Sequence, residues 1–183
     1  GQPAVVVVSQ RLRRLARIRP TNQIAGGVIA VRKGIGREVA RDCGEPQRVG
    51  LDAAAGFPSQ AEVVVQARAA ADVVGATKMD RPEWIAVHPT TREVYCTLTN
   101  NSTRGTDKGP AVDAANPRAN NVYGHIIRWR EQGGDPCTTR FAWDVFVLCG
   151  DPAMPEPDKH GAIKGDIFGS PDGLWFDARG VLW

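Results

Sequence analysis

The sequence predicts an all-β fold, a partial β-propeller, and two observations support this prediction. After Met79 the chain changes to short strand-like runs separated by polar loops that are rich in Gly and Asn. Two hairpins then repeat one pattern, in which a strand, a turn containing Asp or Pro and a second strand follow one another. Such repetition is typical of propeller blades. A closed propeller needs at least about four blades and about two are visible here, so we expect the propeller domain to be incomplete.

The predicted strands alternate with turns over the second half of the chain. The first hairpin turns at His88-Pro89-Thr90-Thr91, and the second turns at Asp177-Ala178-Arg179-Gly180. We expect the residues just before each hairpin, 82–84 and 171–173, to lie at the mouth of the propeller channel. Trp183 falls inside a strand, so we expect that sheet to be unfinished. The predicted strands cover residues 84–87, 93–98, 125–129, 141–148, 173–176 and 181–183.

A short helix is predicted before the strands, over residues 59–74. Ser59 can cap its N-terminus and Glu62 follows three residues later, as in a capping box. Gly75 is placed to end it. The apolar residues that recur at helical spacing are Val63, Val64, Ala67, Ala71 and Val74.

Residues 1–55 form an atypical basic segment, which we separate from an incomplete propeller domain at residues 56–183. Ten Lys and Arg stand against three Asp and Glu in residues 1–50, although the whole chain carries only +3. No aromatic residue interleaves with the arginines of residues 11–19, so we expect a solvated segment and no nucleic-acid partner. The apolar run at residues 4–8 is too short for a membrane span or a signal peptide, so we expect no membrane partner and no export signal.

The densest group of chemically active side chains lies at residues 78–84. Arg81 and Glu83 are two residues apart on an extended segment, so their side chains can point to the same side. A guanidinium matches the oxygens of a phosphate, and a carboxylate is a hard ligand for calcium or iron. A plain surface pair of Arg81 and Glu83 explains the same spacing.

Further polar residues follow predicted strands. Asn100 comes directly after a strand and Asp172 precedes a tight Gly turn, so each is either a metal ligand or a turn former. The loop at residues 113–121 holds one carboxylate, three amides and Arg118, and its length favours a functional role. We interpret His88 as a surface residue, and His125 as a strand histidine bonded to the backbone rather than a ligand.

The four cysteines show no spacing typical of a zinc site. Cys137 and Cys149 flank a predicted strand, and they either form a disulfide or remain buried free thiols.

Four segments resemble successive motifs of the PhoX-type alkaline phosphatase family, in the family's order. The resemblance covers about residues 57–183, and its specificity rests on the order and spacing of the motifs. The segments are residues 75–84 (GATKMDRPEW), 95–102 (YCTLTNNS), 113–130 (DAANPRANNVYGHIIRWR) and 168–177 (FGSPDGLWFD).

This resemblance implies a six-bladed propeller with calcium and iron ions in its central channel. It further implies hydrolysis of small phosphate monoesters, in the periplasm or outside the cell. By position in the motifs, Arg81 corresponds to a catalytic arginine that contacts phosphate, and Glu83 to a metal ligand. Asn100 and Asp172 are expected as further metal ligands, and Arg118 as a second substrate-binding residue.

The chain also departs from the family pattern. The family's iron-binding cysteine lies in a Thr-Cys-Glu-Glu-like motif, whereas Cys43 stands in Asp-Cys-Gly-Glu. Residues 1–55 do not resemble the family in this interpretation. We therefore expect a truncated chain that is a poor catalyst alone. The alternatives are a calcium-dependent, lactonase-type propeller hydrolase and a propeller binding module without catalysis.

Overall fold

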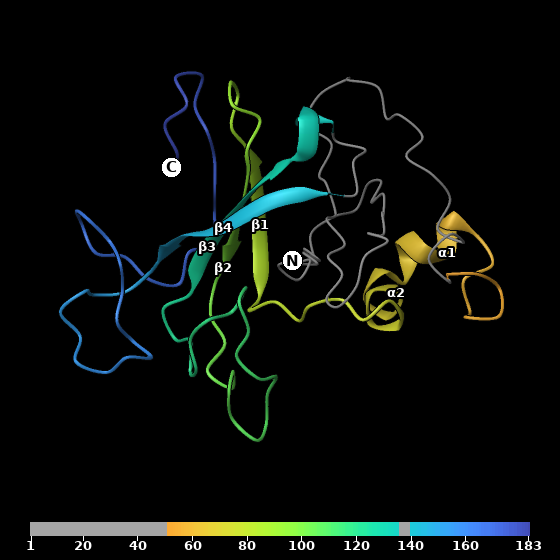
Figure 1. Cartoon of the computed structure of the whole chain (residues 1–183), viewed down its shortest axis with the longest axis horizontal. Coiled ribbons are helices and arrows are strands. Elements are labelled where there is room, and N and C mark those ends of the chain that lie inside the picture. Colours follow the sequence, from red (N-terminus) through yellow and green to blue (C-terminus); the bar gives the residue numbers. More distant parts are fainter. Residues whose placement is uncertain (1–50, 136–139) are drawn as a thin grey trace. The chain divides into compact units, whose positions relative to one another are not determined.

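A computed structural model of the chain describes residues 51–135 and 140–183, and these are the coloured parts of the ribbon in Figure 1. The chain forms two compact units. The two α-helices fall in the first unit, and all four strands fall in the second, which comprises residues 78–134 and 141–183. The expected domain boundary at residue 56 stays a prediction.

The predicted helix forms as two short helices, α1 (Gln60–Val65) and α2 (Ala67–Val73). Ser59 caps α1 as predicted, because its Oγ accepts a hydrogen bond of 3.3 Å from the backbone N–H of Glu62. The prediction of one continuous helix is wrong, since Gln66 leaves the helical conformation with φ −103° and ψ 36°.

The break has a physical cause in the sequence that precedes it. Three consecutive valines, residues 63–65, lose side-chain rotamers in a helix. Only Val63 is buried and Val65 is 81% exposed, so packing does not offset that cost. Gly75 follows the second helix with a φ of +67°, the left-handed conformation expected of a terminating glycine. None of the described helices is long and apolar enough to cross a membrane.

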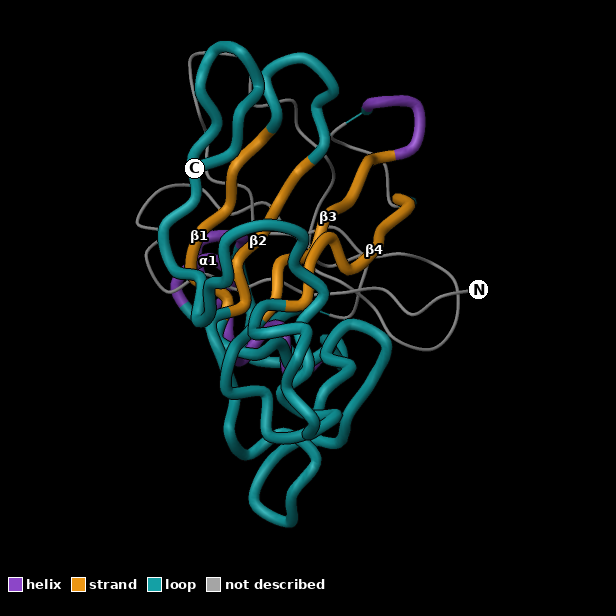
Figure 2. Tube along the Cα trace, turned by 90° about the vertical axis from the view of Figure 1, so that its left-hand side faces the viewer, coloured by secondary structure: helices purple, strands orange, loops and turns teal. Residues whose placement is uncertain are grey.

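Four antiparallel strands make one sheet in chain order, as Figure 2 shows. This meander is the arrangement of a single propeller blade. The four strands predicted at residues 84–148 are confirmed, and the last has the predicted bounds. The number of blades stays a prediction. The strands are β1 (Pro82–Val87), β2 (Val94–Leu98), β3 (His125–Glu131) and β4 (Phe141–Leu148), with a 3-10 turn, η2 (Gln132–Gly134), after β3.

The last residues form the second predicted hairpin, although as a single bridge rather than as strands. Phe176 pairs with Leu182. Trp175 and Trp183 exchange two backbone hydrogen bonds, of 3.0 and 2.7 Å. The hairpin packs on one face of the sheet, where Tyr95 meets the ring of Phe176 edge-on at 5.0 Å. The buried members of this apolar cluster are Ala86, Tyr95, Ile126 and Leu174, and its half-buried members are Trp84, Val147, Phe176 and Leu182.

The two ends of the sheet differ in their connections, as Figure 1 shows. Long irregular segments lie at the end where β1 begins, and we call residues 78–81, 99–124 and 149–172 the loop end. Tight turns lie at the opposite end, and we call residues 88–93 and 177–180 the turn end.

Candidate functional site

Arg81, Glu83 and Asn100 meet at the loop end of the sheet. Pro82 pairs with Leu98, which brings the start of β1 beside the end of β2. Arg81 Nη1 donates to Asn100 Oδ1 over 3.2 Å, and Arg81 Nη2 lies 3.6 Å from Glu83 Oε1. The side chain of Arg81 is 61% exposed and that of Glu83 is 25% exposed. The predicted placement of Arg81 and Glu83 on the same side is confirmed, while their chemical roles stay predictions.

The backbone of Asp172 and of the preceding Pro171 is held by two threonines. Thr97 Oγ1 donates to the carbonyl oxygen of Asp172 over 2.8 Å, and Thr99 Oγ1 donates to that of Pro171 over 2.9 Å. Thr97 Oγ1 also accepts from the backbone N–H of Trp84 in β1, over 3.0 Å. Two threonines of neighbouring strand and loop therefore fix Asp172 beside β1, with its side chain exposed.

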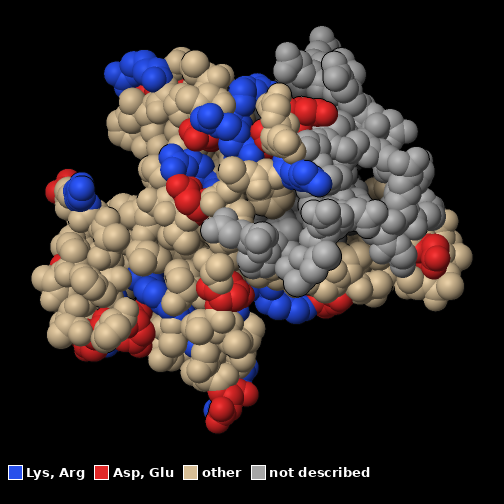
Figure 3. Space-filling model, in the orientation of Figure 1, with Lys and Arg blue, Asp and Glu red and all other residues tan. Residues whose placement is uncertain are grey.

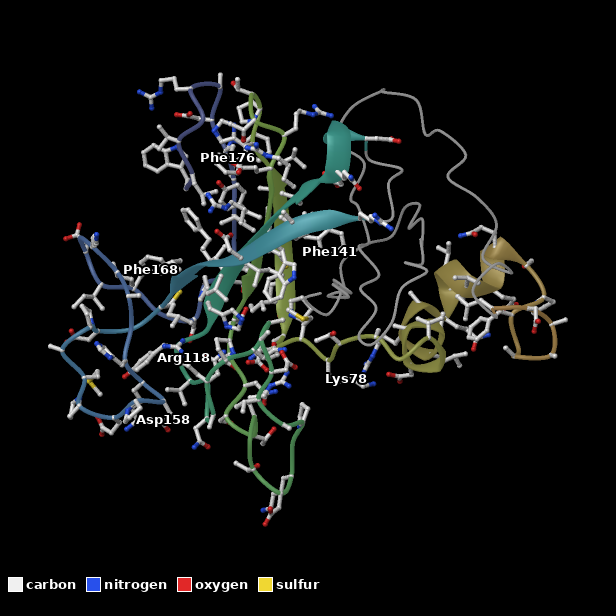
Figure 4. The ribbon with its side chains drawn as sticks, in the orientation of Figure 1. Lys78, Arg118, Phe141, Asp158, Phe168 and Phe176 are labelled. Carbon is white, nitrogen blue, oxygen red and sulfur yellow. The ribbon has the colours of Figure 1, made fainter. Side chains whose placement is uncertain are left out.

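Arg118 is placed differently from Arg81. It is only 5% exposed, and its burial lowers the pKa of the guanidinium. Figure 4 shows Arg118 at the lower end of the sheet, on the side of the loop that carries Asp158. Its substrate-binding role stays a prediction, although both Nη atoms already serve protein acceptors. These are the carbonyl oxygens of Cys149 (2.7 Å), His160 (3.2 Å) and Gly124, and Oδ1 of Asn121 (2.8 Å).

A buried carboxylate, that of Asp80, immediately precedes Arg81 in the chain, and it was not among the residues predicted from the sequence. Asp80 is 0% exposed. Its Oδ1 accepts from Asn101 Nδ2 over 2.9 Å and from Arg104 Nε over 2.8 Å, and its Oδ2 accepts from Asn121 Nδ2 over 2.9 Å. These donors satisfy the charge of a group that would be costly to bury alone. We call Asp80 and Arg104 the buried pair.

The other donors of the buried pair bind the backbone around it. Arg104 is 1% exposed, and its Nη1 donates to the carbonyl oxygen of Ala111 over 2.8 Å. Its Nη2 donates to the carbonyl oxygen of Lys78. Asn116 Oδ1 accepts from the backbone N–H of Asp80 over 3.0 Å, and its Nδ2 donates to the Lys78 carbonyl over 3.1 Å. Side chains of the loop 99–124 thus bind both Lys78 and Asp80, which lie just before Arg81 in the chain.

His125 completes this network as a neutral histidine. Its Nε2 lies 2.7 Å from the carbonyl oxygen of Ala115, and its Nδ1 lies 3.0 Å from Asn121 Nδ2. Nε2 therefore carries the proton and Nδ1 accepts. Burial lowers the pKa of His125 to about 4. The prediction that the backbone satisfies His125 is confirmed.

The described cysteines are buried free thiols. Cys96 and Cys149 are both free, so of the two alternatives for Cys149 the structure selects the thiol. Burial raises the pKa of each thiol, that of Cys149 to about 12. Cys43, Cys137 and the arginines of residues 11–19 lie outside the described residues.

Metal ligands do not cluster within residues 51–135 and 140–183, where no three His, Cys, Asp or Glu side chains are placed to hold one ion. On the face that Figure 3 shows, the acidic and basic side chains of the described residues are interspersed rather than gathered by sign. Glu83, Asn100 and Asp172 offer oxygen donors, which fit a hard cation such as calcium. A complete metal centre needs ligands from outside the described residues.

The comparisons with known proteins decide the family. The model of the family described as Alkaline phosphatase PhoX matches residues 7–183. This chain belongs to the PhoX family. A solved structure, Pseudomonas fluorescens PhoX in complex with vanadate, a transition state analogue, is 53% identical to it with a TM-score of 0.67. Comparison with curated proteins gave no match.

Membership of the PhoX family confirms the predicted resemblance and corrects its extent. The match begins at residue 7, so the expectation that residues 1–55 do not resemble the family is wrong for residues 7–55. The solved PhoX structure is matched over 74% of this chain and 24% of its own length. The chain therefore spans about a quarter of that PhoX protein.

Proposed function

We propose that this chain forms part of a metal-dependent phosphomonoesterase, which hydrolyses small phosphate monoesters and releases inorganic phosphate. One observation carries the proposal. The exposed guanidinium of Arg81 lies beside the Glu83 carboxylate, in a chain that is 53% identical to a PhoX protein solved with vanadate. Vanadate is described there as a transition state analogue, and such an analogue binds where the reacting group is held.

Arg81 is the proposed catalytic residue that contacts phosphate. Its Nη1 and Nη2 atoms point at oxygen acceptors of Asn100 and Glu83, so both donors lie on the side of the proposed ligands. A guanidinium that donates two parallel hydrogen bonds to phosphoryl oxygens stabilises the charge that develops on them. With 61% of its side chain exposed, Arg81 is accessible to a small ester.

Glu83, Asn100 and Asp172 are the proposed metal ligands, and calcium and iron are the proposed ions. Oxygen donors fit calcium, whereas Cys96 and Cys149 are buried thiols with raised pKa values and do not fit as iron ligands. The remaining ligands come from outside the described residues. Bound cations would neutralise the charge of the phosphoryl oxygens. We place the reaction in the periplasm or outside the cell, as the resemblance to the PhoX family implies.

A chimera tests the proposal. The segment of Pseudomonas fluorescens PhoX that matches this chain is replaced by the corresponding residues of this chain, and hydrolysis of p-nitrophenyl phosphate is measured with calcium. We expect an active chimera, and Arg81→Ala should lower kcat/KM by about 100-fold or more, as loss of a transition-state donor does. The 183-residue chain alone should show little activity.

The controls separate this proposal from its alternatives. Arg92→Ala removes an exposed arginine at the turn end and should leave kcat/KM unchanged. A chimera that hydrolyses lactones but not phosphate esters would support a lactonase-type enzyme. Full phosphatase activity after Arg81→Ala and Glu83→Gln together would instead identify this segment as a non-catalytic module.

A further inference from the structure

Arg81 has a backbone conformation that its own side chain does not favour. Its φ is +50°, in the left-handed region that residues other than Gly, Asn and Asp adopt rarely. Such a conformation persists only where the surrounding structure fixes it. The backbone of Arg81 makes two hydrogen bonds. Its N–H donates to the carbonyl oxygen of Met79 over 3.0 Å, and its carbonyl oxygen accepts from Thr99 N–H over 3.1 Å.

The buried pair supplies the missing constraint on the residue before Arg81. Three side-chain donors hold the carboxylate of Asp80, from Asn101, Arg104 and Asn121. The backbone N–H of Asp80 donates to Asn116 Oδ1. Asp80 is thereby fixed through its side chain and its backbone. The Met79–Asp80 peptide cannot rotate without breaking its hydrogen bond to Asn116, and its carbonyl oxygen is the one that accepts from Arg81 N–H.

Arg104 extends the same constraint to Lys78. Its Nε and Nη2 atoms contact Asp80 Oδ1, the latter at 2.8 Å, and Nη2 also donates to the Lys78 carbonyl. One guanidinium therefore binds the chain at two positions on the N-terminal side of Arg81. Figure 4 shows where this segment runs, from Lys78 into β1.

Stability alone does not explain a fully buried ion pair. Removing two charges from water costs several kcal/mol per ion by general estimates, and an apolar pair of similar volume is often as stable. What a buried pair with directional donors does provide is one fixed geometry. Here that geometry is fixed directly beside the residue proposed to contact phosphate.

We propose that Asp80 and Arg104 are positioning residues, which hold the strained backbone of Arg81 so that its guanidinium faces the transferred phosphoryl group. Neither residue touches the substrate, because both side chains are almost wholly buried, at 0% and 1% exposure. This inference rests on the proposed function of Arg81. It assigns to the buried network a role in catalysis that acts only through Arg81.

A double-mutant cycle in the active chimera tests the positioning role. Asp80→Asn keeps the shape of the side chain and removes its charge. We expect kcat/KM for p-nitrophenyl phosphate to fall by about tenfold or more, because a small displacement of a positioned group is costly. Affinity for vanadate should fall in parallel. In the Arg81→Ala background, Asp80→Asn should change kcat/KM by less than about twofold. The reason is that the guanidinium that Asp80 is proposed to position is absent from that background.

Two further variants distinguish a loss of positioning from a loss of folding. Arg104→Lys keeps the positive charge beside Asp80 but loses the forked donors, so it should fold and should lower kcat/KM by a smaller factor than Asp80→Asn. Ile127→Ala, at a buried position of β3, lowers stability without touching Arg81. Ile127→Ala should leave kcat/KM unchanged at a temperature where it and Asp80→Asn are both folded, as checked by circular dichroism.

The outcomes separate this inference from the proposed function. A folded chimera without phosphatase activity contradicts the proposed function and, with it, the positioning role. An active chimera in which Asp80→Asn is equally harmful with and without Arg81 contradicts the positioning role alone. An Arg104→Lys variant with unchanged kcat/KM contradicts it as well.

Discussion

The loop end and the turn end of the sheet stabilise their connections by different means. At the loop end, Arg104 and Asp80 form an ion pair whose side chains are 1% and 0% exposed. At the turn end, Arg130 and Glu93 form a pair of similar length, 2.9 Å, whose side chains are 57% and 18% exposed. The same two kinds of charge are thus used once inside the protein and once in contact with water.

The difference in burial between the two ion pairs indicates which end of the sheet requires a unique geometry. A surface pair adapts to small movements and contributes little, whereas a buried pair tolerates only an arrangement that satisfies every donor and acceptor. The buried arrangement lies at the end that holds Arg81 and Glu83. The turn end relies instead on ring contacts, such as that of His88 with Phe176 at 5.0 Å.

The largest expected effect comes from breaking each ion pair in turn. Arg104→Ala should lower the free energy of unfolding by about 3–5 kcal/mol, because it leaves the Asp80 carboxylate buried and uncompensated. Arg130→Ala should lower it by less than about 1 kcal/mol. Urea unfolding of the chain and both variants, followed by tryptophan fluorescence, measures the difference. Equal losses in the two variants would show that burial does not distinguish the pairs.

Acidification should weaken the loop end next. The pKa of His125 is about 4 in the folded protein and near its ordinary value of 6.5 when unfolded. Below pH 6.5 the unfolded chain therefore binds a proton that the folded protein does not. Stability present at pH 7 is lost as the pH falls toward 4, by about 3 kcal/mol in total.

The histidine contribution is isolated with a second variant. His125→Gln removes the titrating group, so its unfolding free energy should change less than that of the parent between pH 7 and pH 4. Urea midpoints at a series of pH values provide the measurement. Parallel profiles for the two proteins would contradict the lowered pKa.

Substitution of Thr97, in β2 next to the loop end, should lower the free energy of unfolding by a smaller amount. Thr97→Val loses the hydrogen bonds to the Asp172 carbonyl and to the Trp84 N–H, which should cost about 1–3 kcal/mol. Thr97→Ser retains the hydroxyl and should be closer to the parent. The comparison uses the unfolding free energy of each variant, and a serine variant as unstable as the valine variant would show that the methyl group matters instead.

The smallest expected effect lies at the turn end. Gly180 has a φ of +83°, and a Cβ added there would lie 2.7 Å from His88 Nε2. Gly180→Ala should cost about 1–2 kcal/mol, because alanine is strained at this φ and the half-buried His88 ring has to shift. Thermal unfolding measures the change. A loss as large as that of Arg104→Ala would mean that the two ends are equally constrained.

The sequence predicted the elements that depend on neighbouring residues. The strands at 84–148 follow from apolar runs bounded by turn residues, and the bounds of β4 agree with those predicted. The juxtaposition of Arg81 and Glu83 follows from the alternation of strand side chains. These features need no knowledge of distant segments.

What the sequence did not predict depends on distant contacts or on packing. Asp80 and Arg104 are 24 residues apart, and nothing in the spacing of Ser-Thr-Arg-Gly marks that arginine as a buried partner. Arg118 appeared as a loop arginine, but the loops that bury it become visible only once the chain is folded. The break at Gln66 was missed because periodicity indicates which side chains align, not whether they are covered.

The left-handed backbone at position 81 means that stability and catalysis favour different residues there. Glycine or asparagine would occupy a φ of +50° without the penalty of about 1–2 kcal/mol that arginine carries there. In a library varied at position 81 and sorted only for thermal resistance, we expect those two residues to be enriched. A library sorted for phosphate release should return arginine, so the two selections would diverge at a single codon.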